Sequence, residues 1–267
     1  VVDIPTLLLR TMAQNWEGRQ WITHGYRDPD TPKLRVLSYH IFADYNKCNT
    51  IQYSSTRHWD TRRTKLLQEI LSYQPSIVCL QDLDHLNDWW QPMLARNGYD
   101  ICVSQKTRLR ETTNVEFVAV VYKSADFQLF KSIHVELNKC TDAIRDAPSS
   151  LKDRCRTDDV GLITFLQPWG GNETMKTALC IASCSIADRP LDEDVRQHQT
   201  EYFARQVEIA NSEFSLPVII GMSLHDTPTS PAYHILRAGR VPLQPRAPGK
   251  CPKPNIDRIC RGSVRVR

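Results

Sequence analysis

The segment Leu216–Tyr233 joins an apolar run to a loop rich in Pro and Ser, an arrangement that often presents catalytic side chains at the rim of a β-sheet. The run ends at Gly221, and Met222, Ser223 and Leu224 follow. A hard cation such as Mg²⁺ binds carboxylate and amide oxygens. Thioether and isobutyl groups cannot replace them, so the segment predicts the scaffold of a site that lacks the residues for metal-assisted chemistry.

The elements that would position such a site follow from hydrophobic periodicity. An alternating strand is predicted at 34–39, an amphipathic helix at 59–71, and a wholly apolar buried strand at 76–81. Further strands are predicted at 99–103, 115–122, 127–135, 160–166, 178–186 and 217–220, helices at 87–96 and 194–213, and a charged loop at 138–159. Helices between and beside many strands predict an α+β fold, an α/β sandwich of two packed mixed β-sheets flanked by helices.

Length and composition predict one globular domain. The chain has 267 residues and 41% hydrophobic content, enough for a packed core. We expect an irregular leader at 1–33 that packs on the domain, the domain itself at 34–260, and a basic segment at 237–267 that overlaps the last strand. No apolar run approaches the ~18 residues of a membrane span, and the first residues do not resemble a signal peptide. We expect a soluble fragment or processed chain.

The C-terminal segment concentrates positive charge. The whole chain carries a formal charge of +4. Residues 237–267 contain nine basic side chains and one acid, Asp257, which leaves the preceding residues mildly acidic. Such a tail indicates an anionic partner, RNA or an acidic protein surface, or simply a solubilising segment. The candidate binding residues are Arg237, Arg240, Arg246, Lys250, Lys253, Arg258 and Arg261, together with Trp89 and Trp90.

Other chemistries have weak support. The nine cysteines contain no Cys-x-x-Cys pair, and several lie in apolar runs, which is typical of reduced, buried thiols in an intracellular protein. The eight histidines are dispersed, although His40 and His225 could both lie near the pocket and form a new metal site, a less favoured alternative. The chain has no Gly-rich phosphate loop, serine nucleophile elbow or Glu-x-x-His zinc helix.

Ordered sequence blocks resemble the endonuclease/exonuclease/phosphatase superfamily, in detail its deadenylase-like branch and most of all the Angel-type proteins. Val36–Asp44 matches V-x-S-Y-N-I-L-A-x, and Pro75–Asp82 matches P-D-I-x-C-L-Q-E. Asp159–Pro168 and Leu179–Ile186 match N-V-G-L-x-x-x-L-Q-P and C-V-A-N-T-H-L, and Ile220–Leu224 stands where G-D-F-N is expected. The resemblance covers roughly residues 34 to 260 and implies a DNase I-like fold.

The resemblance also implies Mg²⁺-assisted phosphodiester hydrolysis by in-line attack of water, with a His/Asp pair managing the proton. Most of the family's site positions are altered in this chain. His40 replaces an Asn, and Asp82 replaces the metal-binding Glu. Ser185 replaces a second His, which the resemblance implies would stabilise the phosphoryl oxygens. Met222 and Leu224 stand for the Asp and Asn of G-D-F-N.

Two further differences from the family pattern lie toward the C-terminal end of the resemblance. The segment after Gly221 is one residue longer than in the family, so an alternative register places Ser223 and His225 at the site; only a further slide would bring Asp226 there. Asp257 lies in a segment similar to the family's I-D-Y-I strand, which retains that acid, whereas the Ser-Asp-His segment is missing before the chain ends.

Aromatic residues offer two more interpretations. Phe117 follows Glu116 where the family has an acidic-Gly step, and its ring would tend to fill the cleft. Trp89 and Trp90 are by default core residues, and an exposed pair would mark a partner interface.

Three functions follow from these residues. The preferred hypothesis is a catalytically inactive deadenylase-like domain without a cofactor, acting as a protein- or RNA-binding scaffold in RNA metabolism. The alternatives are a weak Mg²⁺-dependent 3′-to-5′ RNA exonuclease or phosphodiesterase that uses Asp82, Asp226 and Asp257, and a basic RNA-binding protein. The expected location is intracellular, cytoplasmic or nuclear, with an organelle such as the mitochondrion left open. No membrane association is expected, and the oligomeric state is open.

Overall fold

The fold was analysed in a computed structural model, which describes residues 34–44, 59–107, 115–142, 144, 146–170 and 178–238. The predicted leader 1–33 and almost all of the basic segment, 239–267, lie outside these residues. Two four-stranded sheets lie face to face, with strand orders β1-β2-β4-β3 and β5-β6-β7-β8. Both sheets are mixed, because β1–β2 and β7–β8 are parallel and the other pairs are antiparallel.

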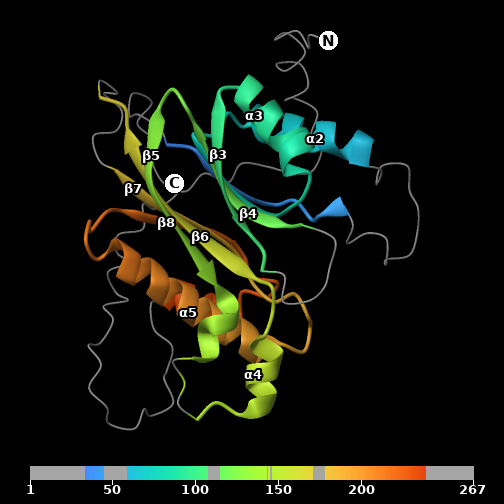
Figure 1. The fold of residues 1–267 in the computed structure, drawn as a ribbon, viewed down its shortest axis with the longest axis vertical. Coiled ribbons are helices and arrows are strands. Elements are labelled where there is room, and N and C mark those ends of the chain that lie inside the picture. The colour runs from blue at the N-terminus through green and yellow to red at the C-terminus, as the bar shows by residue number, and fades with distance from the viewer. Residues whose placement is uncertain are drawn as a thin grey trace.

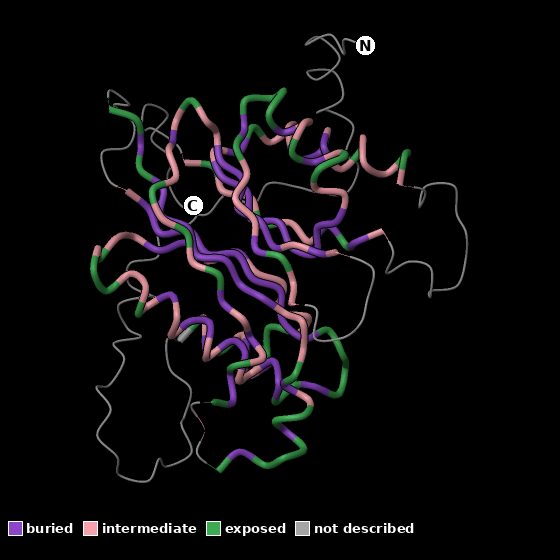
Figure 2. The backbone as a smooth tube through the Cα atoms, viewed as in Figure 1, coloured by how far each residue is buried: buried purple, intermediate pink, exposed green. Residues whose placement is uncertain are grey.

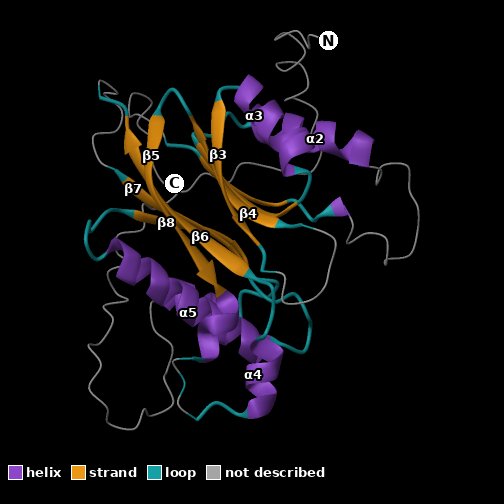
Figure 3. Ribbon diagram, in the orientation of Figure 1, coloured by secondary structure: helices purple, strands orange, loops and turns teal. Residues whose placement is uncertain are grey.

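The strands are β1 (Val36–His40), β2 (Ile77–Leu83), β3 (Tyr99–Gln105), β4 (Phe117–Lys123), β5 (Phe127–Glu136), β6 (Val160–Pro168), β7 (Leu179–Ser185) and β8 (Val218–Ser223). The helices are α2 (Trp59–Ser72), the π-helical turn η3 (Leu86–Trp90), α3 (Gln91–Arg96), the 3₁₀ turn η4 (Leu137–Thr141), α4 (Ser149–Cys155), α5 (Glu193–Asn211) and α6 (Pro231–Ala238). Helices α2 and α3 cover the outer face of the first sheet and α5 that of the second (Figures 1 and 3).

Alternation along the strands creates three apolar layers. Ile77, Val118, Leu162 and Ile181 belong to the cluster between the sheets. A second cluster joins the first sheet to α2 and α3, and a third joins the second sheet to α5. Figure 2 shows the buried residues concentrated along the central strands. Each fully buried aliphatic side chain in these layers stabilises the fold by about 1.5–3 kcal/mol.

The predicted fold class, an α/β sandwich of two mixed sheets flanked by helices, is confirmed. The predicted loop 138–159 contains η4 and α4, which are too short for periodicity to reveal. Helix α6 was also not predicted, and the helix expected at 87–96 begins with a π-helical turn. In the described part of the chain no helix is long and apolar enough to cross a membrane.

The six described cysteines are free thiols, and all except the half-buried Cys102 are buried. Cys79 lies between the sheets, and burial raises the pKa of its thiol to about 12. The prediction of reduced, buried thiols is therefore confirmed for this part of the chain.

Candidate functional site

The carboxyl ends of two parallel strand pairs meet at one rim of the sandwich. Strands β1 and β2 contact β8 across the sheet interface, so the ends of the two sheets lie side by side. Near the end of β2 the pairing with β4 shifts between Leu80 and Leu83, and Asp82 has a positive φ of 53°. A bulge of this kind re-aims a side chain, and here it lets Asp82 reach the rim.

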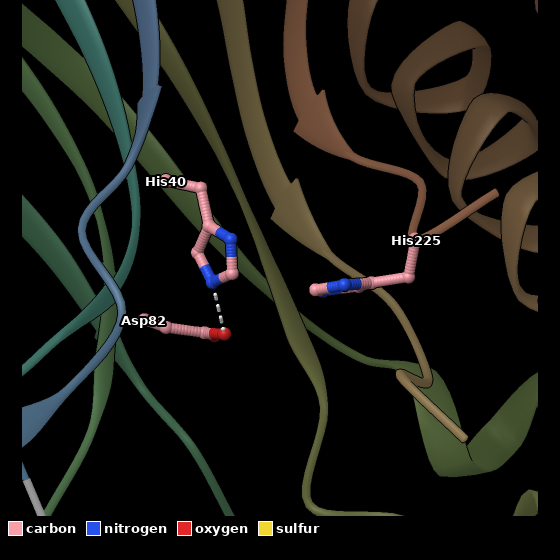
Figure 4. A group of neighbouring side chains, drawn as sticks. All are labelled: His40, Asp82 and His225. Carbon is pink, nitrogen blue, oxygen red and sulfur yellow. Dashed lines mark hydrogen bonds and ion pairs between the residues drawn. The ribbon is translucent and has the colours of Figure 1, made fainter. Parts of the chain in front are cut away.

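His40, Asp82 and His225 form a compact group at this rim (Figure 4). His40 Nε2 lies 2.8 Å from Asp82 Oδ2. The imidazoles of His40 and His225 meet edge to face, with ring centroids 5.1 Å apart. One ligand atom from each of the three residues lies within 4.8 Å of the others. The sequence suggested that the two histidines could be near the pocket, and the structure brings them together with Asp82.

Lys106 follows β3 and extends into a group of three carboxylates. Its Nζ lies 2.9 Å from Asp82 Oδ1, 2.5 Å from Glu116 Oε2 and 3.9 Å from Asp159 Oδ1. The side chains of Lys106 and Asp82 are only 18% and 9% exposed. Both oxygens of Asp82 therefore have partners, an ammonium on one side and an imidazole on the other.

The electrostatics favour a charged network. Burial acts against ionisation of Asp82, but the His40 hydrogen bond and the charge of Lys106 hold its pKa well below the usual range. Burial also acts against the charge of Lys106, and the carboxylates of Asp82, Asp159 and Glu116 raise its pKa above the usual value. For Asp159 burial outweighs the attraction of Lys106 and raises the pKa.

The side chains of β8 alternate in a way that decides between the two registers of this segment. Met222 and Leu224 pack against the cluster under α5, on the outer face of the sheet. Ser223 faces the first sheet, where its hydroxyl donates to Gln81 Oε1 at 3.4 Å, and His225 faces His40. Met222 and Leu224 therefore do not reline the cleft, as the direct register predicted, and the alternative register with Ser223 and His225 replaces it.

Gln81 links the two walls below the rim. Its Nε2 donates to Ser183 Oγ at 3.1 Å and to the carbonyl of Gly221 at 3.3 Å. A Cβ on Gly221 would lie 2.6 Å from Cys79 Cβ, so this close approach of β8 to β2 requires glycine. Ser185, two residues after Ser183 on β7, is buried and shares its face of the strand.

The weak-exonuclease hypothesis uses two further acids, Asp226 and Asp257, and neither is seen at this site in the part of the chain that the structure describes. Asp226 Oδ2 accepts from Arg196 Nε at 2.9 Å, an ion pair with α5. That guanidinium lowers the pKa of Asp226 although burial acts in the opposite direction. Asp257 lies outside the described residues, so its predicted role at a strand end stays a prediction.

The aromatic candidates lie on the opposite side of the first sheet. Phe117 packs in the layer under α2 and α3, so its ring does not fill the cleft as expected. Trp90 is fully buried in the same layer, which rules out a direct role in an interface. Trp89 is half-buried, and the guanidinium carbon of Arg63 lies over its ring, 4.5 Å from the ring centroid. For this pair the core interpretation is confirmed.

Of the basic candidates, Arg237 is exposed in the last turn of α6. The remaining basic candidates lie outside the described residues: Arg240, Arg246, Lys250, Lys253, Arg258 and Arg261.

Lys106 and Asp159 were not singled out from the sequence, and Glu116 was noted only beside Phe117. Nothing in their local spacing indicates an ion-pair network, because they come from the end of β3 and the starts of β4 and β6. Lys106 and Glu116 meet through the pairing of β3 with β4, and Asp159 joins them only when the sheets stack.

This architecture is that of the endonuclease/exonuclease/phosphatase fold. The catalytic domain of human Nocturnin with bound sulfate matches with a TM-score of 0.61 and 23% identity, over 78% of this chain and 70% of that chain. ANGEL2, described as a 2′,3′-cyclic phosphatase, matches with a TM-score of 0.64 and 22% identity, over 77% and 56%. At such identities the likeness shows the fold alone.

Sequence relatives give a more specific comparison than the shared fold. The chain is 28% identical over 230 residues to Carbon catabolite repressor protein 4 homolog 1 of Arabidopsis thaliana, 79% of this chain and 38% of that protein. It is 27% identical over 228 residues to Protein angel homolog 2 of Bos taurus, 82% and 39%. No family model matches. The homologues of this chain are deadenylase-like proteins of the endonuclease/exonuclease/phosphatase superfamily, and the chain spans about two fifths of the length of these curated relatives.

Proposed function

We propose that this chain is a catalytically inactive deadenylase-like domain that serves as a scaffold for a protein or RNA partner in RNA metabolism. The observation that carries the proposal is that both oxygens of Asp82 already have partners. Asp82 is the one metal-binding position of the family at which this chain keeps a carboxylate. Lys106 and His40 lie within 2.9 and 2.8 Å of its two oxygens. A carboxylate neutralised by a buried ammonium is poorly placed to hold a hard dication and a phosphate.

The fit to Mg²⁺ supports the same conclusion. This ion prefers octahedral oxygen coordination at about 2.0–2.1 Å and usually keeps several waters. At the rim, His40 and His225 offer nitrogen and Ser223 offers a hydroxyl. The Lys106 ammonium, 2.9 Å from Asp82 Oδ1, already occupies one of the few carboxylate oxygens that an octahedral ion would need. The donor set is therefore a poor match for Mg²⁺, and we derive no catalytic step through it.

The opposite wall lacks the imidazole that the resemblance implies for stabilising the phosphoryl oxygens. The resemblance places an imidazole where Ser185 stands, and that hydroxyl is buried at the end of β7. Groups that act together in a catalytic site show strongly non-additive losses. The combined change at His40, Asp82 and Ser185 therefore supports loss of turnover rather than a modest reduction.

The direct test is a nuclease assay with a short oligoadenylate, in Mg²⁺ and separately in Mn²⁺. We expect no turnover above background, measured by gel resolution of the 3′ ends, while an active deadenylase cleaves under the same conditions. Asp82→Ala and the exposed-site control His134→Ala should both leave this background unchanged. Metal-dependent turnover that Asp82→Ala abolishes and His134→Ala preserves would contradict the proposal.

The nature of the partner is tested through the salt dependence of binding. If RNA binds through the basic segment, affinity falls steeply with salt, because neutralised phosphates release counterions. Deleting residues 239–267 should then abolish RNA binding while leaving α6 intact. A complex that persists in high salt would instead favour an apolar protein interface.

A further inference from the structure

The rim group His40, Asp82 and His225 has the composition of a transition-metal site. It offers two imidazole nitrogens and one carboxylate oxygen from three separate segments, the ends of β1 and β2 and the loop after β8. In Figure 4 the imidazole of His225 extends from the end of β8 toward the other two side chains. Such N₂O donor sets hold borderline divalent ions, with Zn²⁺ the commonest when three protein ligands leave one position open.

We propose that His40, Asp82 and His225 bind a borderline divalent ion of the Zn²⁺ type, in place of the hard ion used elsewhere in the superfamily. The distances support this assignment. Donors around a tetrahedral ion with bonds of about 2.0–2.1 Å lie roughly 3.3 Å apart. The His40 Nε2–Asp82 Oδ2 distance is 2.8 Å, and all three ligand atoms lie within 4.8 Å of one another. Binding would require side-chain rotations that bring the three atoms to that spacing.

His225 supplies an independent observation. Its Nε2 is buried and has no hydrogen-bond partner among the described residues. A buried polar atom without a partner costs about 1–3 kcal/mol, so such an atom calls for a ligand.

Backbone strain coincides with two of the three ligands. Asp82 has a φ of 53° and His225 a φ of 47°, in the left-handed region that non-glycine residues seldom adopt. Residues held in such conformations cluster at binding and catalytic sites. Here the two strained residues turn their side chains toward the same point.

The local charge also favours a dication. The carboxylates of Asp82, Glu116 and Asp159 face one ammonium, that of Lys106, so the fully ionised group has a formal charge of −2. Lys106 is held on the Oδ1 side of Asp82, which leaves Oδ2 facing His40. An ion between Oδ2 and His40 Nε2 would take the place of the proton that these atoms share.

The site goes beyond the proposed function and does not depend on it, because a domain without nuclease activity can hold an ion for stability or for docking a partner. A protein that binds Zn²⁺ and cleaves no RNA agrees with both proposals. A protein that binds Zn²⁺ and also cleaves RNA would overturn only the proposed function.

The test is calorimetric titration of the metal-free 267-residue chain with Zn²⁺ and, in parallel, Mg²⁺. We expect one Zn²⁺ per chain and at least about 100-fold weaker binding after His225→Ala, since loss of even an outer-shell partner typically costs 10–100-fold. His134, exposed on β5, provides the matched control, and His134→Ala should bind Zn²⁺ as the unaltered protein does. Equal weakening in the two variants, or Mg²⁺ binding as tight as Zn²⁺ binding, would overturn the proposal.

A second measurement on the unaltered protein guards against misfolding of the variant. The X-ray absorption edge of bound Zn²⁺ should show only nitrogen and oxygen neighbours, at about 2.0–2.2 Å. A sulfur shell near 2.3 Å would place the ion on cysteines and overturn the assignment. Absence of any stoichiometric Zn²⁺ binding would overturn it as well.

Discussion

The parallel pairs β1–β2 and β7–β8 have matching places in the two sheets and different chemistry at their carboxyl ends. The first pair ends with His40 and Asp82, and Lys106 joins Asp82 from the neighbouring β3. The second pair ends with the hydroxyls of Ser185 and Ser223. The first wall is charged, with three carboxylates around one ammonium, whereas the second wall is neutral up to His225.

This contrast separates two kinds of contact at one rim. Phosphodiester hydrolysis draws on fixed charges and proton donors on both sides of the phosphate. The first wall here pairs its carboxylates with a buried ammonium, and the hydroxyl of Ser223 on the second wall forms a hydrogen bond between the sheets. Each of the following predictions breaks or sharpens that comparison.

The largest effect is expected from Lys106→Met, which leaves three carboxylates without their buried cation. Removing one partner of a buried pair destabilises by about 3–5 kcal/mol, so the free energy of unfolding in urea at neutral pH should fall by that amount. The control is Lys131→Met, which breaks an exposed pair with Glu213 and should cost about 1 kcal/mol or less. Equal losses in the two variants would show that the charged wall is no more than a surface feature.

The junction between the walls is tested by Gly221→Ala. The added Cβ would lie 2.6 Å from Cys79 Cβ and 2.9 Å from its Sγ. Overpacking of this kind costs about 1–3 kcal/mol. A Cβ on Gly170 meets nothing within 4 Å, so Gly170→Ala should change the free energy of unfolding by no more than about 0.5 kcal/mol. An unaffected Gly221→Ala variant would mean that the sheets separate easily here.

A smaller effect concerns Asp159, whose pKa is raised because it is buried. An acid with a raised folded-state pKa contributes stability below its unfolded pKa of about 3.9 and loses that contribution as pH rises through the folded value. The stability of Asp159→Asn relative to the unaltered protein should therefore increase as pH rises from about 4 toward 7. Urea unfolding across this range measures it, and the opposite slope would mean that Lys106 outweighs burial.

The smallest effect is expected on activity from Ser223→Asp, which returns a carboxylate to the neutral wall. Oligoadenylate turnover in Mg²⁺ should stay at background, because Lys106 still forms an ion pair with Asp82 and the other site positions still differ from those of the family. Turnover that appears with this single change would show that the neutral wall alone accounts for inactivity.

Much of the fold could be predicted from the sequence because the main elements are long and regular. The apolar run before Asp82 and the helical spacing at 59–71 correspond to β2 and α2. The helix α4 has only seven residues, too few for a hydrophobic period to stand out. Its formation depends on packing of Leu151 and Cys155 against the α5 region.

The candidate site was predicted in part. His40, Asp82 and Ser185 were identified from aligned blocks, and the structure places all three at or just below the rim. The prediction that Met222 and Leu224 line the cleft was wrong, because a one-residue shift exchanges the two faces of a strand. The partners of Asp82 could not be predicted either, since Lys106 is distant in sequence and carries no local signal.

The order of residue types along the chain already determined a two-sheet sandwich and predicted altered site positions, since periodicity and block order are properties of the linear chain. Only the folded molecule decided that β8 turns Ser223 and His225 inward and that one ammonium holds three carboxylates. Those facts depend on the stacking of segments far apart in sequence, where the close contact at Gly221 sets the register.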